Sequence, residues 1–196
     1  GLCVTTTGPG VTNALTGTLC SWQDSVATVY LSGQSRSGNL ASGFRVRQAG
    51  TQHLDVGPLV SSIVKEFFRV DNPRGSLERI ARMILHAQEG RPGPVWIDVP
   101  LDIQLTEIDV NELEAGLKAL GNPPVSSSVQ QSTASPTDFS NEVFNAACAS
   151  DRPLFLFGNG LSRASIEELG DLLTNTKIPF VTTWGLAGHP IELLDG

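Results

Sequence analysis

The chain has 196 residues, enough for one large domain or two small ones, and its 40% hydrophobic content is that of a globular protein. Thirteen basic residues against twenty acidic ones give a net charge of -7, and no basic cluster is present, which argues against a nucleic-acid partner. No apolar run approaches the roughly 20 residues that a membrane-spanning helix needs, so we expect no membrane segment.

The three cysteines are widely spaced and form no Cys-x-x-Cys pair. Such a pattern argues against a disulfide framework or a zinc site, and it favours small core cysteines in a reducing, cytoplasmic compartment. The chain begins with Gly1, directly ahead of a predicted strand, and it ends shortly after another one. We therefore expect both ends to be truncations of a longer protein.

The first half of the chain alternates strand and helix signals. Residues 2–6 and 26–31 are short apolar runs that predict strands, and a glycine turn and a predicted helix over 11–22 separate them. A strand, a helix and a second strand in this order predict a parallel βαβ unit.

Two further helices and an inner strand are predicted next. Apolar residues recur at helical spacing over 59–67 and again over 77–85, where Ser76 is a plausible N-cap. Residues 95–99 are short, apolar and β-branched, which is typical of a parallel strand buried on both faces.

The second half begins with a segment that cannot form a core. Residues 121–136 contain three prolines, six serines or threonines and no charge, so we place a linker at 109–137. Beyond it, predicted helices over 139–147 and 165–173 alternate with predicted strands over 154–157 and 180–183. The fold class is therefore α/β, with parallel-sheet three-layer domains: two partial domains, 1–108 and 138–196, joined by a linker.

Two glycine turns stand where a strand passes into a helix. At Gly8-Pro9-Gly10 a ligand can approach the backbone closely, although a tight turn alone would also explain the motif. Gly158-Asn159-Gly160 has the place of a nucleotide-binding loop, but Arg163 stands where the third glycine of that fingerprint belongs. Asp98, near the end of its strand, could face a ligand or bond to the following loop, and His53 with Asp55 lacks the further ligands of a metal site.

Taken together, the motifs resemble the acetolactate synthase family of thiamine diphosphate-dependent enzymes. The stretches that carry the resemblance are residues 1–13 (GLCVTTTGPGVTN), 31–34 (LSGQ), 89–100 (EGRPGPVWIDVP) and 180–184 (FVTTW). The resemblance implies that residues 1–108 are the later part of the pyrimidine-binding domain and that 138–196 are the start of the Rossmann-like central domain.

The resemblance also implies the cofactors and their residues. In this family the aminopyrimidine of thiamine diphosphate lies against the Gly-Pro-Gly turn, so we expect cofactor contacts at Gly8, Pro9, Gly10 and Asn13, with Gln34 near the site entrance. Gln52 looks like the family's substrate-facing glutamine, although Thr51 stands where the synthases often have phenylalanine. Positions that touch FAD in the flavin-containing members correspond to Gly158, Gly160 and Thr183.

The family's remaining catalytic parts are expected outside this sequence. The glutamate that activates the cofactor belongs upstream of Gly1, and the Mg²⁺ ligands belong downstream of Gly196, so we expect no catalytic or metal-binding residue here and no turnover by this chain alone. The diphosphate is held by another subunit in this family, which implies a homodimer or a tetramer.

The function implied is that of a 2-keto acid decarboxylating synthase or lyase, most like acetolactate synthase, in which a cofactor ylid joins two 2-keto acids. Two alternatives stay open. One is a thiamine diphosphate-dependent decarboxylase or acyl-CoA lyase, and the other is a non-catalytic module for nucleotide binding and dimerisation.

Overall fold

The computed structural model describes residues 1–40, 46–121, 136–161, 165, 168–170 and 178–186. The chain falls into two compact units, Gly1–Ser126 and Ser127–Gly196. We describe each unit by itself. The assignment of residues 1–108 and 138–196 to two enzyme domains stays a prediction.

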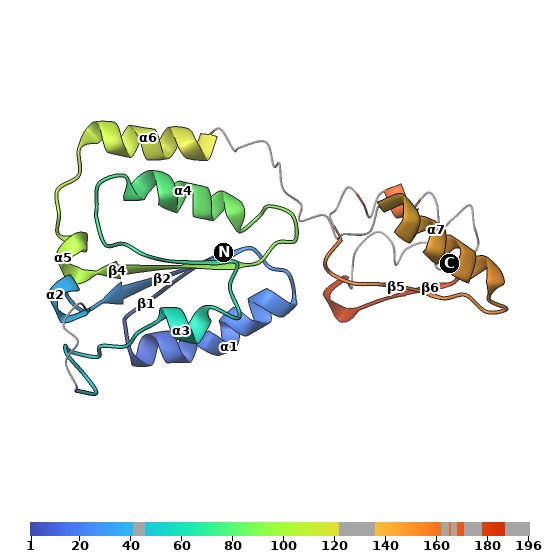
Figure 1. The fold of residues 1–196 in the computed structure, drawn as a ribbon, viewed down its shortest axis with the longest axis horizontal. Helices are drawn as coiled ribbons and strands as arrows, with labels where there is room; N and C mark the ends of the chain where they lie inside the picture. Colours follow the sequence, from blue (N-terminus) through green and yellow to red (C-terminus); the bar gives the residue numbers. More distant parts are fainter. Residues whose placement is uncertain (41–45, 122–135, 162–164, 166–167, 171–177, 187–196) are drawn as a thin grey trace. The chain divides into compact units, whose positions relative to one another are not determined.

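A four-stranded parallel sheet forms the centre of the first unit (Figure 1). Its strands lie in the order β1, β2, β4, β3, with bounds β1 Leu2–Thr5, β2 Thr28–Gln34, β3 Glu66–Arg69 and β4 Pro94–Pro100. All three neighbouring pairs are parallel, so the predicted α/β class with a parallel sheet is confirmed.

Helices cover both faces of this sheet (Figure 1). On one face lie α1 (Pro9–Gln23), which links β1 to β2, and the short α3 (Gly57–Val60). On the other face lies α4 (Ser76–His86), against which α6 (Val110–Gly121) packs as an outer helix. Two short helices, α2 (Ser37–Leu40) and α5 (Leu101–Gln104), follow the ends of β2 and β4 and contact each other.

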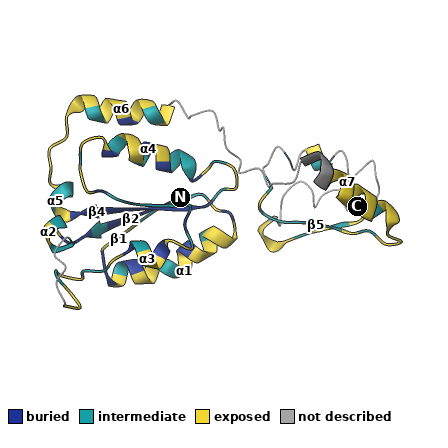
Figure 2. Ribbon diagram, in the orientation of Figure 1, coloured by how far each residue is buried: buried dark blue, intermediate teal, exposed yellow. Residues whose placement is uncertain are grey.

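The alternation of side chains along the strands creates two separate cores, and Figure 2 shows the buried residues concentrated in the sheet. The core beneath α1 and α3 is built around Tyr30 and Trp96, whose rings stack at 5.0 Å with an interplanar angle of 10°. The core beneath α4 contains Val95 and Ile97 together with Met83. Because β4 lies between β2 and β3 and carries residues of both cores, the prediction of a strand buried on both faces is confirmed.

One predicted helix is wrong. Within 59–67 only Leu59 and Val60 are helical, at the end of α3; residues 61–65 form turns, and residues 66–67 belong to β3. Phe67 and Phe68 lie in β3 and point to opposite faces, where they pack against the two different cores. A pairing with β4 satisfies the backbone of this aromatic segment and buries both rings, which a one-sided surface helix could not do.

Smaller differences concern helix ends. Ser76 is not the N-cap of α4: that position is occupied by Gly75, whose φ of 74° suits glycine, while the Ser76 hydroxyl donates to the carbonyl of Pro73 at 2.6 Å.

The first part of the predicted linker, residues 110–121, is the helix α6, because its apolar side can pack on α4. Residues 122–135 lie outside the described part of the chain.

The second unit contains a two-stranded parallel sheet. Strands β5 (Phe155–Phe157) and β6 (Phe180–Thr182) pair in register, and Phe157 and Phe180 pack together with Leu161. The helix α7 (Pro136–Ala149) precedes them and the 3₁₀ helix η1 (Trp184–Leu186) follows them. The predicted helix over 165–173 falls mostly outside the described residues.

The cysteines are all free, as expected, but only in part buried. Cys3 packs against the core beneath α1, whereas Cys20 and Cys148 are exposed, so the expectation of core cysteines is wrong for these two. Among the helices that the structure describes, none is long and apolar enough to cross a membrane.

The stack of Trp96 on Tyr30 predicts a large effect of one substitution. Trp96→Ala should lower the free energy of unfolding by about 3–5 kcal/mol, because Trp96 is fully buried and its loss leaves a cavity between β4 and the helices. Trp184→Ala is the matched control: this side chain is 94% exposed, and its loss should change the free energy of unfolding by less than about 0.5 kcal/mol. Urea unfolding of both variants tests this, and equal effects would contradict it.

Candidate functional site

A row of polar side chains crosses the sheet near the carboxyl ends of its strands. The strand register places Ser32 of β2, Asp98 of β4 and Arg69 of β3 side by side. They lie two residues beyond the row of Tyr30 and Trp96, and therefore on the same face of the sheet. In open α/β sheets the carboxyl ends of the strands are the usual place for ligands, so this edge is where a site is expected.

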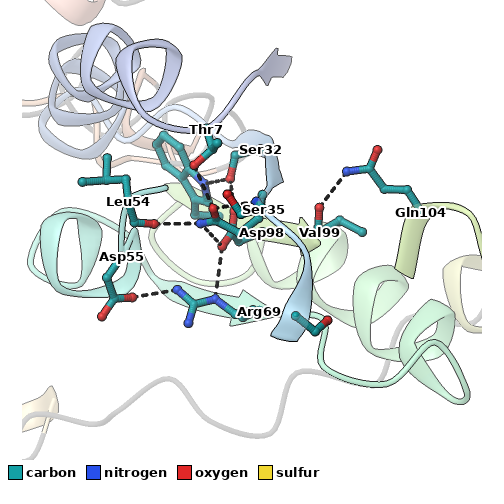
Figure 3. Close-up of polar contacts among 12 residues, drawn as sticks. Thr7, Ser32, Ser35, Leu54, Asp55, Arg69, Asp98, Val99 and Gln104 are labelled. Atoms are coloured by element: carbon teal, nitrogen blue, oxygen red, sulfur yellow. Dashed lines mark hydrogen bonds and ion pairs between the residues drawn. The ribbon is translucent and has the colours of Figure 1, made fainter. Parts of the chain in front are cut away.

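Asp98 is the buried centre of this row (Figure 3). Its carboxylate accepts hydrogen bonds from the Ser32 hydroxyl at 2.6 Å, from Gln34 Nε2 at 3.2 Å and from Arg69 Nε at 3.2 Å. Burial raises the pKa of Asp98, although the three donors favour the carboxylate and oppose that shift. Neither sequence-based alternative is correct, because Asp98 bonds to neighbouring strands and is not exposed to a ligand.

The Gln34 side chain is used entirely inside the protein. Its Nε2 donates to the Leu54 carbonyl at 2.7 Å as well as to Asp98, and its Oε1 accepts from the Thr7 hydroxyl at 3.0 Å and the Ser35 amide at 2.8 Å. Two donors and two acceptor positions are all that a primary amide has. Gln34 therefore holds the site together and leaves no hydrogen-bonding capacity for a ligand in this structure.

The Gly8-Pro9-Gly10 turn carries the chain from β1 into α1. Gly8 has a φ of 65°, and a Cβ at this position would lie 2.6 Å from the carbonyl oxygen of Gln52. Both the conformation and the space exclude any other residue. The turn is thus pressed directly against the backbone of Gln52, a residue 44 positions later that the resemblance also assigns to the site.

Gln52 itself adopts a left-handed conformation, with a φ of 56°. Its Oε1 accepts a hydrogen bond from the Thr6 hydroxyl at 3.4 Å, which ties it to the end of β1. A non-glycine residue in this conformation is uncommon, and such residues cluster at functional sites.

A hollow of about 410 Å³ opens between these elements. Most of its lining residues are polar, and they come from the ends of β1 and β2, from α2 and α5, and from the loop before α3. The lining residues are Thr6, Thr7, Gly33, Gln34, Ser35, Arg36, Asn39, Thr51, Gln52, Leu101 and Gln104. This volume accommodates a small organic ligand or part of a larger one.

The structure brings only some of the predicted site residues to this hollow. Gln34 and Gln52 line it, and Gly8 contacts the backbone of Gln52 without lining the hollow itself. Pro9 and Asn13 are exposed in the first two turns of α1 and do not line it.

The remaining predicted residues belong to the second unit, where they cluster by themselves. Gly158 and Thr183 follow the paired strands β5 and β6, and a Cβ on Gly158 would lie 4.0 Å from the Thr183 side chain. The Thr183 amide donates to the Phe157 carbonyl at 2.8 Å, and Gly160 lies in the turn after Gly158. The register of the two strands thus brings together the positions that the resemblance assigned to FAD.

No metal site is apparent in the part of the chain that the structure describes, where no three metal-ligating side chains gather. Asp55 forms an ion pair with Arg69 at 2.7 Å, which accounts for this carboxylate without a metal. That His53 and Asp55 bind no metal ion stays a prediction.

Sequence reasoning missed Ser32, Arg69 and Trp96 as parts of one network. Trp96 Nε1 donates to the Ser32 hydroxyl at 2.9 Å, and Ser32 donates on to Asp98. These residues are separated by 27 to 64 positions, and only the strand register brings them together. A sequence signal exists for Asp98 alone, as a charge inside an otherwise apolar strand.

Comparisons with known proteins identify relatives but no matching family model. A probable acetolactate synthase large subunit of Methanocaldococcus jannaschii is 33% identical over 98% of this chain, which covers 32% of that protein. The acetolactate synthase large subunit of Corynebacterium glutamicum is 31% identical over 93% of this chain and 27% of its own length. A chloroplastic acetolactate synthase of Arabidopsis thaliana is 29% identical over 98% of this chain and 27% of its own length. The chain spans about a third of the length of these curated relatives.

The two carboxylates on Arg69 give a matched pair of substitutions. Asp98→Ala should lower the free energy of unfolding by about 3 kcal/mol or more, because it leaves Arg69 and Ser32 without their buried partner. Asp55→Ala removes a carboxylate whose side chain is 62% exposed, so the loss should not exceed about 1 kcal/mol. Urea unfolding of the two variants measures both, and a larger loss from Asp55→Ala would refute this account of the network.

Proposed function

This chain is an acetolactate synthase-like member of the thiamine diphosphate-dependent enzymes, and we propose that its first unit forms the pyrimidine side of the cofactor site. The observation that carries the proposal is the contact between the Gly8 turn and Gln52. Two positions that the family assigns to cofactor and substrate, far apart in sequence, meet there beside a polar hollow.

The residues present fit the cofactor at this turn. Pro9 is exposed, so a flat ring can approach the backbone at the start of α1, while Gly10 packs closely on Thr6, whose Cγ2 would lie 2.9 Å from a Cβ at this position. Gly8, Pro9, Gly10 and Asn13 would hold the pyrimidine side, and the Gln34 network would keep the adjoining strand ends in place. The bound cofactor would supply the electron sink for decarboxylation of a 2-keto acid.

The activity proposed for the whole protein is that of a decarboxylating synthase that joins 2-keto acids, as the family resemblance implies; the relatives are named acetolactate synthases. No glutamate is among the described residues that line the hollow, so activation of the cofactor needs a residue from elsewhere. We therefore propose that this chain alone does not turn over substrate and that the active protein is a homodimer or a tetramer. Among the described residues no three metal-ligating side chains gather, and we propose that Mg²⁺ would take its ligands from elsewhere in the whole protein.

For the second unit we propose an FAD-binding role for Gly158, Gly160 and Thr183. Glycines at the end of β5 allow the backbone to approach a nucleotide, and Thr183 adds a hydroxyl beside them. The cytoplasmic location stays a prediction, and one of the plant relatives is chloroplastic by name.

The Gly8 turn provides the test of the cofactor site. In the full-length protein with Mg²⁺, Gly8→Val should weaken thiamine diphosphate binding at least tenfold, because the new side chain collides with Gln52 and displaces the turn. Gly75→Val is the matched control, since Gly75 has a similar φ of 74° but open space where its Cβ would be. Isothermal titration calorimetry measures both, and an unchanged affinity in Gly8→Val would remove this turn from the site.

The products formed from pyruvate test the reaction. The full-length protein with thiamine diphosphate and Mg²⁺ should form acetolactate, because a synthase transfers the decarboxylated fragment to a second 2-keto acid. Acetaldehyde as the main product would assign the protein to the decarboxylases instead. Nuclear magnetic resonance of the reaction mixture distinguishes the two products.

A further inference from the structure

Among the residues that the structure describes, Arg36 is the one cationic residue that lines the hollow, and no described aspartate or glutamate lines it. The residue follows the end of β2 and is exposed. Its guanidinium forms no ion pair or hydrogen bond with the residues that the structure describes. The five N–H donors of the guanidinium are therefore not used by the described residues. Arginine in proteins usually binds a carboxylate or a phosphate.

The backbone on both sides of Arg36 is fixed. Ser35 is buried, its amide donates to Gln34 Oε1 at 2.8 Å, and its hydroxyl donates to the Thr51 carbonyl at 3.2 Å. Ser37 donates to Asp102 Oδ1 from its amide at 2.9 Å and from its hydroxyl at 3.1 Å. The arginine side chain therefore leaves from a defined position at the rim of the hollow, which lowers the entropy lost when it binds a ligand.

Two of the side-chain amides that line the hollow with Arg36 differ in their hydrogen bonds: that of Gln34 is fully bonded within the protein, and that of Gln52 can still donate. Gln34 has no capacity left, since both its nitrogen and its oxygen bond within the protein. Gln52 accepts from Thr6 through Oε1, and this contact orients the amide so that Nε2 remains a donor. Arg36 and Gln52 thus both offer N–H groups in the lining of the same hollow.

We propose that Arg36 binds the carboxylate of the small 2-keto acid substrate in this hollow and that Gln52 Nε2 donates to the same ligand. A planar guanidinium matches a carboxylate with two parallel hydrogen bonds, which a neutral group could not form. The inference rests on the proposed function for the identity of the acid, but the anion site stands on the charge and the contacts of the hollow. Arg36 is then a substrate-binding residue that neither the family resemblance nor the relatives assign.

The test measures pyruvate binding to the full-length protein with Mg²⁺ but without thiamine diphosphate, so that pyruvate is not consumed. Arg36→Gln should weaken pyruvate binding at least tenfold. Arg36→Lys keeps the charge but not the paired geometry, so its affinity for pyruvate should lie between those of the wild-type protein and Arg36→Gln. Arg74→Gln is the matched control: it removes the same charge from an exposed arginine that does not line the hollow, and pyruvate affinity should not change. Thermal melts followed by circular dichroism check that every variant is folded.

Two further ligands identify what the arginine recognises. Pyruvamide, which lacks the negative charge, should bind wild type at least tenfold more weakly than pyruvate, and Arg36→Gln should remove that difference. Inorganic phosphate should bind more weakly than pyruvate. Tighter binding of phosphate, or equal binding of pyruvamide, would overturn the assignment of a carboxylate site.

Failure of this inference is distinguishable from failure of the proposed function. Arg36→Gln should leave thiamine diphosphate affinity unchanged, because Arg36 is separate from the Gly8 turn. Unchanged pyruvate affinity in a variant that still binds the cofactor would overturn the role of Arg36 and leave the proposed function standing. A loss of cofactor affinity in Arg36→Gln would assign the arginine to the cofactor and would also overturn the inference.

Discussion

The buried carboxylate of Asp98 is the interaction on which the first unit depends. It lies on the central strand β4 and accepts hydrogen bonds from side chains of both neighbouring strands, Ser32 and Gln34 of β2 and Arg69 of β3. A charge removed from water is costly unless it is paired and hydrogen-bonded, so the three strand ends must stay in one register to satisfy it. The same network fixes Gln34, and through Gln34 it fixes the segment that forms the rim of the hollow.

This arrangement separates the stable part of the site from the part that can meet a ligand. Beneath the strand ends, Tyr30 and Trp96 form a stacked aromatic layer, and the Asp98 network lies directly beyond it. Above it, the Gly8 turn, Gln52 and Arg36 are supported by backbone and amide contacts that leave their outer surfaces open. The first group has its hydrogen bonds complete, and the second still offers donors, which is what a binding surface requires.

Local sequence signals were sufficient for the fold class and for much of the first unit. The apolar run at 95–99 and the helical spacing at 77–85 correspond to β4 and α4, because both elements obtain their pattern from burial alone. The failure at 59–67 has a physical cause: the apolar residues of α3, of the following turn and of β3 happen to recur at helical spacing, and only the pairing of Phe67 and its neighbours with β4 excludes a continuous helix. Asp98 could be singled out as a charge in a strand, but its partners could not, because Ser32 and Arg69 reach it only through the register of three strands.

The contacts of the loop over residues 51–55 have a consequence for the energetics of recognition. Its carbonyls at Thr51 and Leu54 accept from Ser35 and Gln34, and its Asp55 pairs with Arg69, so three of its five residues are tied to β2, β3 or the residue after β2. A loop with so many attachments has already lost most of its conformational freedom on folding. Since this ordering is complete before any ligand arrives, even a molecule of a few heavy atoms could bind there without having to organise the protein around itself.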